Sequence, residues 1–268
     1  MGWGENVSWA EQAGENGRLA AMRAGALVRA AVEVVLPPQA LDVARGAAPV
    51  LTRGLTAEAW SKITFIEAPV CDGCGGPQAY ETGLRCAACL ARPRAFDRVR
   101  AAVLYDDASR DLVLKLKRAD RTDLASLFAL WLGRAASDLV ADADIVIPVP
   151  LHPLRLIARR FNQAAEIARP LARRAGLSYL PGALIRRRNT PSQGGRSGSG
   201  RRRNMAAAFA APKRAWPRLA GRRVLLVDDV ITTGATAEAC ARVLKAAGAT
   251  CVHVAAVARV QAPDAAPI

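Results

Sequence analysis

A stretch of thirteen residues near the C-terminus does most to constrain the fold of this chain. It runs from Val224 to Thr236 and has the sequence VLLVDDVITTGAT. Four consecutive aliphatic residues are typical of a strand buried on both faces, and such strands belong mainly to parallel sheets covered by helices. Two carboxylates and a turn of small residues follow. The pattern therefore predicts a strand, a ligand-binding turn at its carboxyl end, and a helix that starts at the turn.

Alternating strands and helices are predicted throughout residues 96–262. Short β-branched or aliphatic runs predict strands over residues 98–105, 144–149, 223–227 and 250–258. Leucine and valine at helical spacing predict helices over residues 109–118, 122–140, 153–175 and 235–247. Pro170 is expected to kink the third of these helices. The expected fold class is α/β, with helices on both faces of a mostly parallel sheet.

The turn after the two carboxylates has the chemistry of a phosphate site. A helix N-terminus offers unpaired N–H groups and the positive end of a dipole, and both favour an anion. Threonine hydroxyls add donors, and Gly234 allows the backbone to approach a ligand closely. Asp228 and Asp229 can accept hydrogen bonds from the hydroxyls of a ribose. No Gly-Lys-Ser/Thr is present, which excludes the ATP-type phosphate loop. The alternative is an ordinary strand–turn–helix in which Asp229 and the threonines are caps.

Four cysteines form a second motif. Cys71 and Cys74 make one C-x-x-C pair, and Cys86 and Cys89 make another after eleven intervening residues. Paired knuckles of this kind place four thiolates around a tetrahedral zinc ion, in a closed structural site. A redox-active or unliganded set of thiols is the alternative. The other two cysteines, Cys240 and Cys251, lie in apolar runs and are expected to be inert core thiols.

The positive charge is confined to one part of the chain. The net charge of the chain is +15. Residues 151–223 contain 18 basic residues and a single acidic residue, Glu166. Such a stretch points to a polyanionic ligand, either a phosphorylated small molecule or a nucleic acid. Compositional bias is the alternative, and it explains why arginine outnumbers lysine but not why acids are missing.

Hydropathy and charge also bear on the class and location of the protein. No apolar run approaches the ~18 residues of a membrane helix, so a membrane-spanning protein is not expected. The N-terminus carries Glu5, Glu11 and Glu15 in place of a basic leader, so we expect a cytoplasmic protein. The predicted organisation has a disordered segment at 1–23, an N-terminal helix and zinc module at 24–95, the α/β domain at 96–262 and a tail at 263–268.

The motif at 224–236 closely resembles the phosphoribosyl-pyrophosphate signature of type I phosphoribosyltransferases. Residues 146–152 (VIPVPLH) look like the strand and tight loop that bind pyrophosphate in these enzymes. The resemblance implies that Asp228 and Asp229 hold the ribose 2′- and 3′-hydroxyls, with Mg²⁺ as cofactor. It assigns the 5′-phosphate to Thr232, Thr233, Gly234, Ala235 and Thr236, and the pyrophosphate to Pro150, Leu151 and His152. For His152, a role as a turn residue or helix cap is the alternative.

Further segments narrow the resemblance to the ComF family. They are RFNQA at 160–164, RNTPSQ at 188–193, Arg203-Asn204 and Phe209, and the likeness covers roughly residues 30–262. The family joins a zinc ribbon to a phosphoribosyltransferase-like domain and is associated with DNA uptake in competent bacteria. The resemblance makes four arginines candidates for binding pyrophosphate or nucleic-acid phosphates: Arg159, Arg160, Arg188 and Arg203. A solvated basic face is the alternative for each of them.

Two departures from the family pattern matter. Its earlier pair of C-x-x-C knuckles is replaced by Ala40, Val43, Thr56 and Ala59, so one zinc site is expected where the family often has two. The segment 195–200 (GRSGSG) is richer in glycine than the family pattern, which puts in doubt whether that loop closes as a lid.

Two functions remain open from the sequence. The first is a phosphoribosyltransferase in which an acceptor displaces pyrophosphate at ribose C1; the sequence does not identify the acceptor. The second is a non-catalytic accessory protein that binds single-stranded DNA, or senses phosphoribosyl pyrophosphate, for the competence machinery. The basic stretch 151–223 has only four aromatic residues, which argues against extensive base stacking; they are Phe161, Tyr179, Phe209 and Trp216.

Overall fold

The computed structural model describes residues 54–78, 85–117, 123–187 and 208–261. The chain divides into two units, residues 1–57 and 58–268, and nearly all described residues belong to the second. The predictions for residues 1–23 and 263–268, for a helix at 24–36, and for Arg188 and Arg203 lie outside the described residues.

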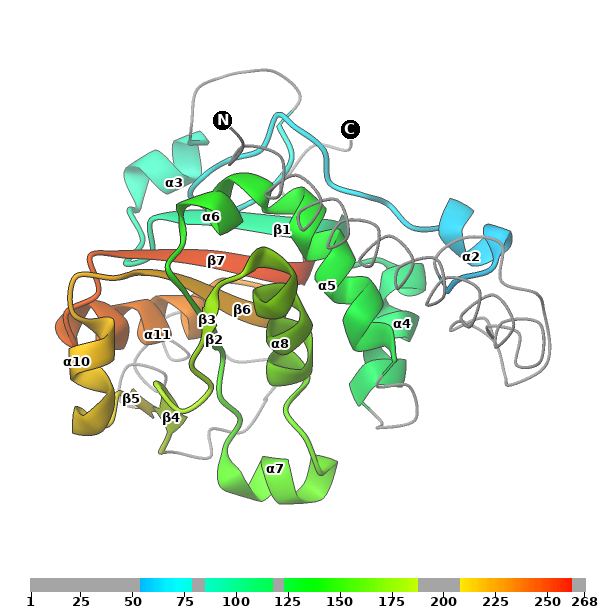
Figure 1. Ribbon diagram of the computed structural model, residues 1–268. Helices are drawn as coiled ribbons and strands as arrows, with labels where there is room; N and C mark the ends of the chain where they lie inside the picture. The colour runs from blue at the N-terminus through cyan, green and yellow to red at the C-terminus, as the bar shows by residue number, and fades with distance from the viewer. Residues whose placement is uncertain (1–53, 79–84, 118–122, 188–207, 262–268) are drawn as a thin grey trace, which may run out of the picture. The chain divides into compact units, whose positions relative to one another are not determined.

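Five parallel strands form the main sheet, in the order β1-β7-β6-β2-β3 (Figure 1). Their bounds are β1 Arg98–Leu104, β2 Ile145–Pro148, β3 Ser178–Tyr179, β6 Arg223–Ile231 and β7 Cys251–Arg259. A two-stranded antiparallel sheet joins β4 (Ile185–Arg186) to β5 (Phe209–Ala210). The prediction of a mostly parallel sheet is confirmed. Burial explains it, because seven consecutive residues of β7 are buried and a strand of this kind needs cover on both faces.

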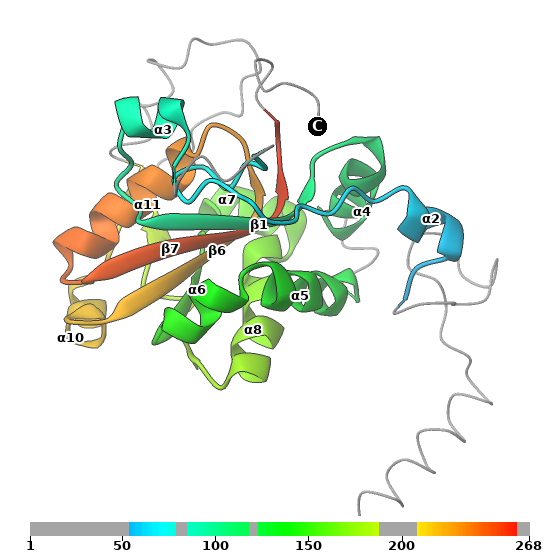
Figure 2. The same ribbon diagram turned by 90° about the horizontal axis from the view of Figure 1, so that it is seen from above.

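Helices cover both faces of the sheet. In Figure 2, α11 lies on one face, and α5, α6 and α8 lie on the other. The helices of the α/β part are α4 Asp107–Lys117, α5 Leu124–Ala135, α6 Ser137–Asp142, α7 Pro153–Arg159, α8 Gln163–Ala175, α10 Trp216–Leu219 and α11 Ala235–Ala246. Two short helices precede them, α2 Ala57–Ser61 and α3 Ala87–Ala91, and a 3₁₀ turn spans Lys213–Ala215. Among the described helices, none is long and apolar enough to cross a membrane.

The expectation of one helix over 153–175 is wrong. The structure has two helices, α7 and α8, and the chain between them passes through a left-handed conformation at Arg160, with φ of 64°. Asn162 then caps α8, because its side chain accepts a hydrogen bond from the N–H of Ala164 at 3.1 Å. Pro170 lies inside α8. The capping asparagine therefore marks the boundary that the apolar spacing did not reveal.

Two other boundaries differ from expectation. The helix expected over 122–140 is divided at Ala136 into α5 and α6. β6 continues to Ile231, so the two carboxylates lie within its last part and do not follow it. Pairing with the neighbouring strand extends β6, since Asp228 is opposite Ala256 and Val230 is opposite Ala258. The acid pair is therefore held by the sheet itself.

Candidate functional site

The two ligand-binding segments that the sequence suggested meet at one edge of the sheet. β2 and β6 are parallel neighbours, and Pro148 is opposite Val227. The N–H of Val149 donates to the carbonyl of Val227 at 2.8 Å, which extends the pairing beyond β2. The loop of Pro150, Leu151 and His152 therefore leaves the sheet beside the acid pair. This is the carboxyl edge, where ligands of open α/β sheets bind.

The acid pair is fixed by its own backbone and by a lysine. Asp228 accepts a hydrogen bond from the N–H of Asp229 at 2.9 Å, and Asp229 accepts one from the N–H of Val230 at 2.8 Å. Nζ of Lys117, the last residue of α4, lies 2.8 Å from Oδ2 of Asp229. Burial and the negative charge of Asp229 raise the pKa of Asp228 well above its ordinary value. The site therefore concentrates negative charge that a cation or a protonated group would relieve.

The turn after β6 exposes backbone donors. Thr232 and Thr233 are exposed, and Gly234 is buried with φ of 76° at the N-cap of α11. A left-handed conformation of this kind favours glycine. Among the described residues, no side chain forms a cap hydrogen bond at this end of α11. Gly234 at the N-cap brings no side-chain acceptor, so the first N–H groups of the helix can bind an anion. Ala235 and Thr236, which open the helix, are half-buried.

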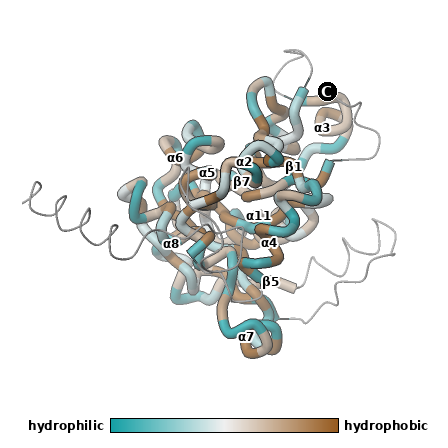
Figure 3. Tube along the Cα trace, turned by 90° about the vertical axis from the view of Figure 1, so that its right-hand side faces the viewer, coloured by the Kyte–Doolittle hydropathy of each residue, from teal (hydrophilic) through white to brown (hydrophobic). Residues whose placement is uncertain are grey.

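The loop after β2 has a more local role in the structure. His152 is the N-cap of α7, where its Nδ1 accepts a hydrogen bond from the N–H of Leu154 at 3.3 Å. Arg160 is exposed at the other end of α7. Nδ2 of Asn162 donates to the carbonyl of Val149 at 2.9 Å, so the start of α8 is tied to the same loop. Figure 3 shows hydrophobic and hydrophilic residues interspersed along α7, and its Ile157 is 76% exposed.

Two basic residues lie near the acid pair, and the sequence did not predict this position for either of them. Lys117 comes from α4, and nothing in the sequence around it marks it as a partner of Asp229. Arg186 of β4 is positioned over the ring of Phe209, with 5.3 Å between its Cζ and the ring centroid. Burial and the positive charge of Arg155 lower the pKa of Arg186, while the negative charge of Asp228 acts in the opposite sense. The basic run at 186–188 was the one signal that could have indicated Arg186.

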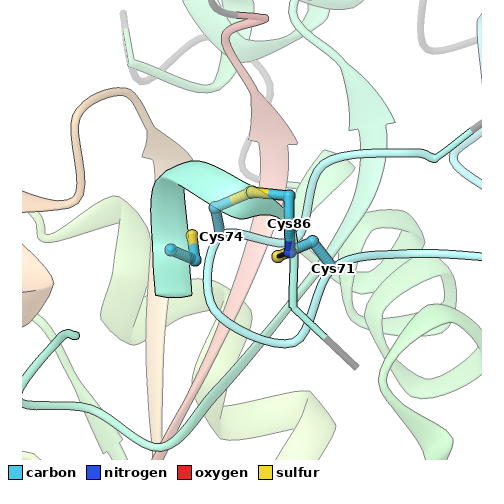
Figure 4. Close-up of side chains that lie close together, drawn as sticks. Cys71, Cys74 and Cys86 are labelled. Carbon is cyan, nitrogen blue, oxygen red and sulfur yellow. Dashed lines mark hydrogen bonds between the residues drawn. The ribbon is translucent and has the colours of Figure 1, made fainter. Parts of the chain in front are cut away.

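The four cysteines of the C-x-x-C pairs come together as predicted. Their sulfur atoms all lie within 4.8 Å of one another, and Figure 4 shows three of them, Cys71, Cys74 and Cys86, side by side. The N–H of Cys86 donates to Sγ of Cys71 at 3.1 Å. Hydrogen bonding from Cys74, more than any other cause, lowers the pKa of Cys71 to about 4, which favours a thiolate there. Thiolate sulfurs in this arrangement could bind a metal ion.

The local backbone also suits a metal knuckle. A Cβ at Gly73 would lie 2.7 Å from Cβ of Cys89, so glycine is required where the two pairs approach each other. Nε of Arg259 lies 3.4 Å from where a Cβ of Gly76 would be. The hydrogen bond with Cys71 and burial raise the pKa of Cys74, and the positive charge of Arg259 partly offsets that rise. A cation beside the cluster offsets the negative charge that four thiolates would carry. The donor set and its surroundings therefore fit zinc.

The cysteine cluster is attached to the edge strand β1. The N–H of Val99 donates to the carbonyl of Asp72 at 2.8 Å. The buried Asp72 carboxylate pairs with Arg100 at 2.6 Å and with Arg98 at 3.3 Å. Both arginines also pair with the Asp138 carboxylate of α6, Arg98 at 2.6 Å and Arg100 at 2.8 Å. This network links the knuckle to the sheet and to the helix layer over it.

A second attachment reaches the helix that begins at the phosphate-binding turn. Nη1 of Arg94, which follows α3, lies 3.3 Å from Oε2 of Glu238 in the first turn of α11. Phe96 is buried beneath the turn, with its Cζ 3.5 Å from where a Cβ of Gly234 would be. The cluster and the turn thus share one packed region.

The fold, a mostly parallel sheet with flanking helices, is that of the type I phosphoribosyltransferases. The family model described as phosphoribosyl transferase domain matches residues 162–267, which include the acid pair and the turn. Over 200 residues the chain is 32% identical to the DNA utilization protein YhgH of Escherichia coli strain K12, covering 72% of this chain and 86% of that protein. It is 30% identical over 198 residues to Competence protein F of Haemophilus influenzae, covering 71% and 85%. The chain belongs to the ComF family.

Solved structures with a similar arrangement include an adenine phosphoribosyltransferase. The likeness covers 56% of this chain and 76% of that chain, at 19% identity and a TM-score of 0.36.

Proposed function

We propose that the protein binds phosphoribosyl pyrophosphate together with Mg²⁺ at the carboxyl edge of the sheet and transfers the phosphoribosyl group to an acceptor. The observation that carries the proposal is the juxtaposition of the acid pair on β6 with the uncapped N-terminus of α11. One part suits a ribose diol and a cation, and the other suits a phosphate.

Each part of the site has a defined task in this proposal. Asp228 and Asp229 accept hydrogen bonds from the ribose hydroxyls. The N–H groups and hydroxyls of residues 232–236 hold the 5′-phosphate. The proposal assigns the pyrophosphate to the loop of residues 150–152 and to the guanidinium of Arg160. Asp228 and Asp229 would hold Mg²⁺, because carboxylate oxygens are the donors that it prefers, and the bound ion would supply positive charge to the site.

The ion pair between Lys117 and Asp229 suggests what this lysine does before and after the ligand binds. In the absence of ligand, Nζ of Lys117 neutralises part of the acid pair from 2.8 Å. In the proposed complex, Lys117 would supply a positively charged donor to the leaving pyrophosphate. As an acceptor attacks ribose C1, the bond from C1 to the pyrophosphate oxygen breaks and the pyrophosphate carries away the electron pair. Positive side chains around it stabilise that charge.

The cysteine cluster has a structural task in the proposal. We assign it one Zn²⁺ ion held by Cys71, Cys74, Cys86 and Cys89. With four thiolates in place, a tetrahedral ion has no open position, so the zinc would support the fold and not the reaction.

A thermal-shift experiment tests the proposal. A ligand at about 100 times its Kd stabilises the native state by ~2.7 kcal/mol, which corresponds to roughly 5–10 °C in melting temperature for a unit of this size. We expect this shift with phosphoribosyl pyrophosphate and Mg²⁺, and a smaller one with ribose 5-phosphate. Replacing Asp228 and Asp229 together with asparagine should remove the shift, since amides hold a cation and a diol less well. An unchanged shift in the double variant would place the ligand elsewhere.

The accessory function is the second candidate, and the basic stretch 151–223 favours it. α7 adds Arg155 and Arg159 beside exposed apolar side chains, a combination that suits a nucleic-acid strand. Relatives named for DNA utilization and competence are consistent with such a partner. A screen of free nucleobases separates the two candidates. The enzyme releases pyrophosphate with at least one base in the presence of Mg²⁺, whereas the accessory protein binds single-stranded DNA in a salt-sensitive way and releases none.

A further inference from the structure

A second group of metal-ligating side chains lies at the opposite edge of the sheet from the acid pair. Asp142 ends α6, and Cys251 and His253 lie at the start of β7. One potential ligand atom from each of the three lies within 4.8 Å of the other two. None of these residues belongs to the phosphoribosyl site or to the cysteine cluster.

The two residues on β7 are placed on one face by strand geometry. Side chains at positions i and i+2 of a strand point to the same side, so Cys251 and His253 are neighbours there. Sγ of Cys251 lies 3.4 Å from Nε2 of His253. Oδ2 of Asp142 lies 2.7 Å from that same nitrogen. The imidazole is almost fully buried, with 3% of its side chain exposed, while 40% of the Asp142 side chain is exposed.

The approach of both Cys251 and Asp142 to one nitrogen of His253 is not explained by a histidine–aspartate hydrogen bond alone. A ring nitrogen carries one proton at most, so it cannot direct a full hydrogen bond to the carboxylate and another to the sulfur. An imidazole nitrogen, a carboxylate oxygen and a thiolate sulfur can all be satisfied at once by a single metal ion. The other oxygen of Asp142 is already held, since Oδ1 lies 2.7 Å from Nη1 of Arg223. Oδ2 is therefore oriented toward the cluster.

We propose that Asp142, Cys251 and His253 form a second metal site, for a borderline divalent ion such as Zn²⁺ or Co²⁺. Nitrogen, oxygen and sulfur donors together suit these ions and not Mg²⁺ or Ca²⁺. Three protein ligands leave a fourth position for water, which the exposed side of Asp142 can admit. Binding displaces the thiol proton of Cys251 to solvent. With three protein ligands where the cysteine cluster offers four, the ion is held less tightly than in that cluster.

The site would join parts of the chain that are distant in sequence. Asp142 belongs to the helix layer, while Cys251 and His253 belong to a central strand. Asp97 lies beside them, where its carboxylate accepts a hydrogen bond from the N–H of Val252 at 2.8 Å and pairs with Lys245 at 2.8 Å. An ion here would add a cross-link between α6 and β7, and it would stabilise the native state by mass action.

Cobalt titration of the zinc-loaded full chain tests the proposal. We expect the wild type to bind one further equivalent of Co²⁺, with visible bands of tetrahedral cobalt and a charge-transfer absorption from one thiolate. Cys251→Ser should lose the charge-transfer absorption. Asp142→Asn should weaken cobalt binding by on the order of tenfold or more. Cys240→Ser is the matched control, because it removes a buried thiol of α11 that is outside the cluster, and it should bind cobalt as the wild type does.

X-ray absorption at the cobalt edge keeps the test independent of whether the variants fold. In the unmodified chain we expect one sulfur ligand per added cobalt ion, with nitrogen and oxygen completing the shell. Four sulfur ligands would mean that cobalt had replaced zinc in the cysteine cluster and would overturn the proposal. A wild type that takes up no further cobalt, or a Cys251→Ser variant with an unchanged spectrum, would also overturn it.

Discussion

Replacing Gly234 with alanine should separate the stability of the turn from its ability to bind phosphate. Gly234 has φ of 76°, and an added Cβ would lie 3.5 Å from Cζ of Phe96, an ordinary van der Waals distance. The expected cost is therefore conformational and not steric. A left-handed conformation costs an alanine ~1–2 kcal/mol, and the stiffer unfolded chain returns ~0.4–1 kcal/mol. The net loss is about 1 kcal/mol, or roughly 2–4 °C in melting temperature.

Binding should suffer more than stability. The strain at an alanine is relieved by rotating the peptide groups of the turn, which turns N–H donors away from the phosphate. Losing one hydrogen bond to a charged group costs ~1.5–3 kcal/mol, so affinity for phosphoribosyl pyrophosphate should fall by roughly ten- to a hundredfold. Calorimetric titration in Mg²⁺ measures this loss directly.

Gly176→Ala provides the matched control. Gly176 is the C-cap of α8 with φ of 67°, and an added Cβ would have nothing within 4 Å. It should lose about the same stability, roughly 1 kcal/mol, and keep its affinity for the ligand. Equal affinities in the two variants would refute the assignment of the turn at 232–236 as the phosphate cradle. A melting temperature that falls for Gly176→Ala alone would refute the strained conformation of Gly234.

Three further outcomes are expected. Metal analysis of protein dialysed against metal-free buffer should give about one equivalent of zinc, and two tightly held equivalents would contradict the single four-thiolate site. Cys74→Ser should lose this zinc, while the α/β domain stays helical by circular dichroism. Replacing arginines 201–203 with glutamine, outside the described residues, should flatten the salt dependence of single-stranded DNA binding, whose slope is about −0.7 per phosphate, and leave the melting temperature nearly unchanged. Because the pKa of Asp228 is raised, more of this carboxylate is protonated at a given pH than of an ordinary aspartate, and the protonated fraction grows as pH falls. Affinity for Mg²⁺ and phosphoribosyl pyrophosphate should therefore decrease with decreasing pH. An affinity independent of pH would argue against a role for this carboxylate.

The sheet could be predicted from the sequence because its strands are buried on both faces. Continuous aliphatic runs such as Val224 to Val227 are typical of strands in this environment. The ends of elements were harder to place. β6 extends past its aliphatic run because β7 pairs with Asp228, and that partner is a tertiary feature. α7 and α8 divide at a capping asparagine, Asn162, within a sequence whose apolar spacing continues.

The parts of the candidate sites that local sequence encodes could be predicted, and the parts that depend on tertiary contacts could not. The cysteine cluster depends on local spacing, and the acid pair and turn form one continuous motif, so both were visible in the sequence. Lys117 was not, because its contact with Asp229 depends on how α4 is placed against the sheet. The convergence of Asp142 on His253 was also invisible, since α6 and β7 are far apart along the chain. Local motifs indicated where ligands bind, whereas the charges that complete those sites required the fold.

Isothermal titration of the full chain with phosphoribosyl pyrophosphate, with and without Mg²⁺, tests the central claim most directly. A phosphoribosyl-pyrophosphate site at the acid pair predicts one saturable site per chain in Mg²⁺ and much weaker binding without it. It also predicts loss of the binding heat when Asp228 and Asp229 are both replaced by asparagine. Binding that survives the double substitution at full affinity, or a wild type that shows no binding heat in Mg²⁺ over a range of temperatures, would contradict the account.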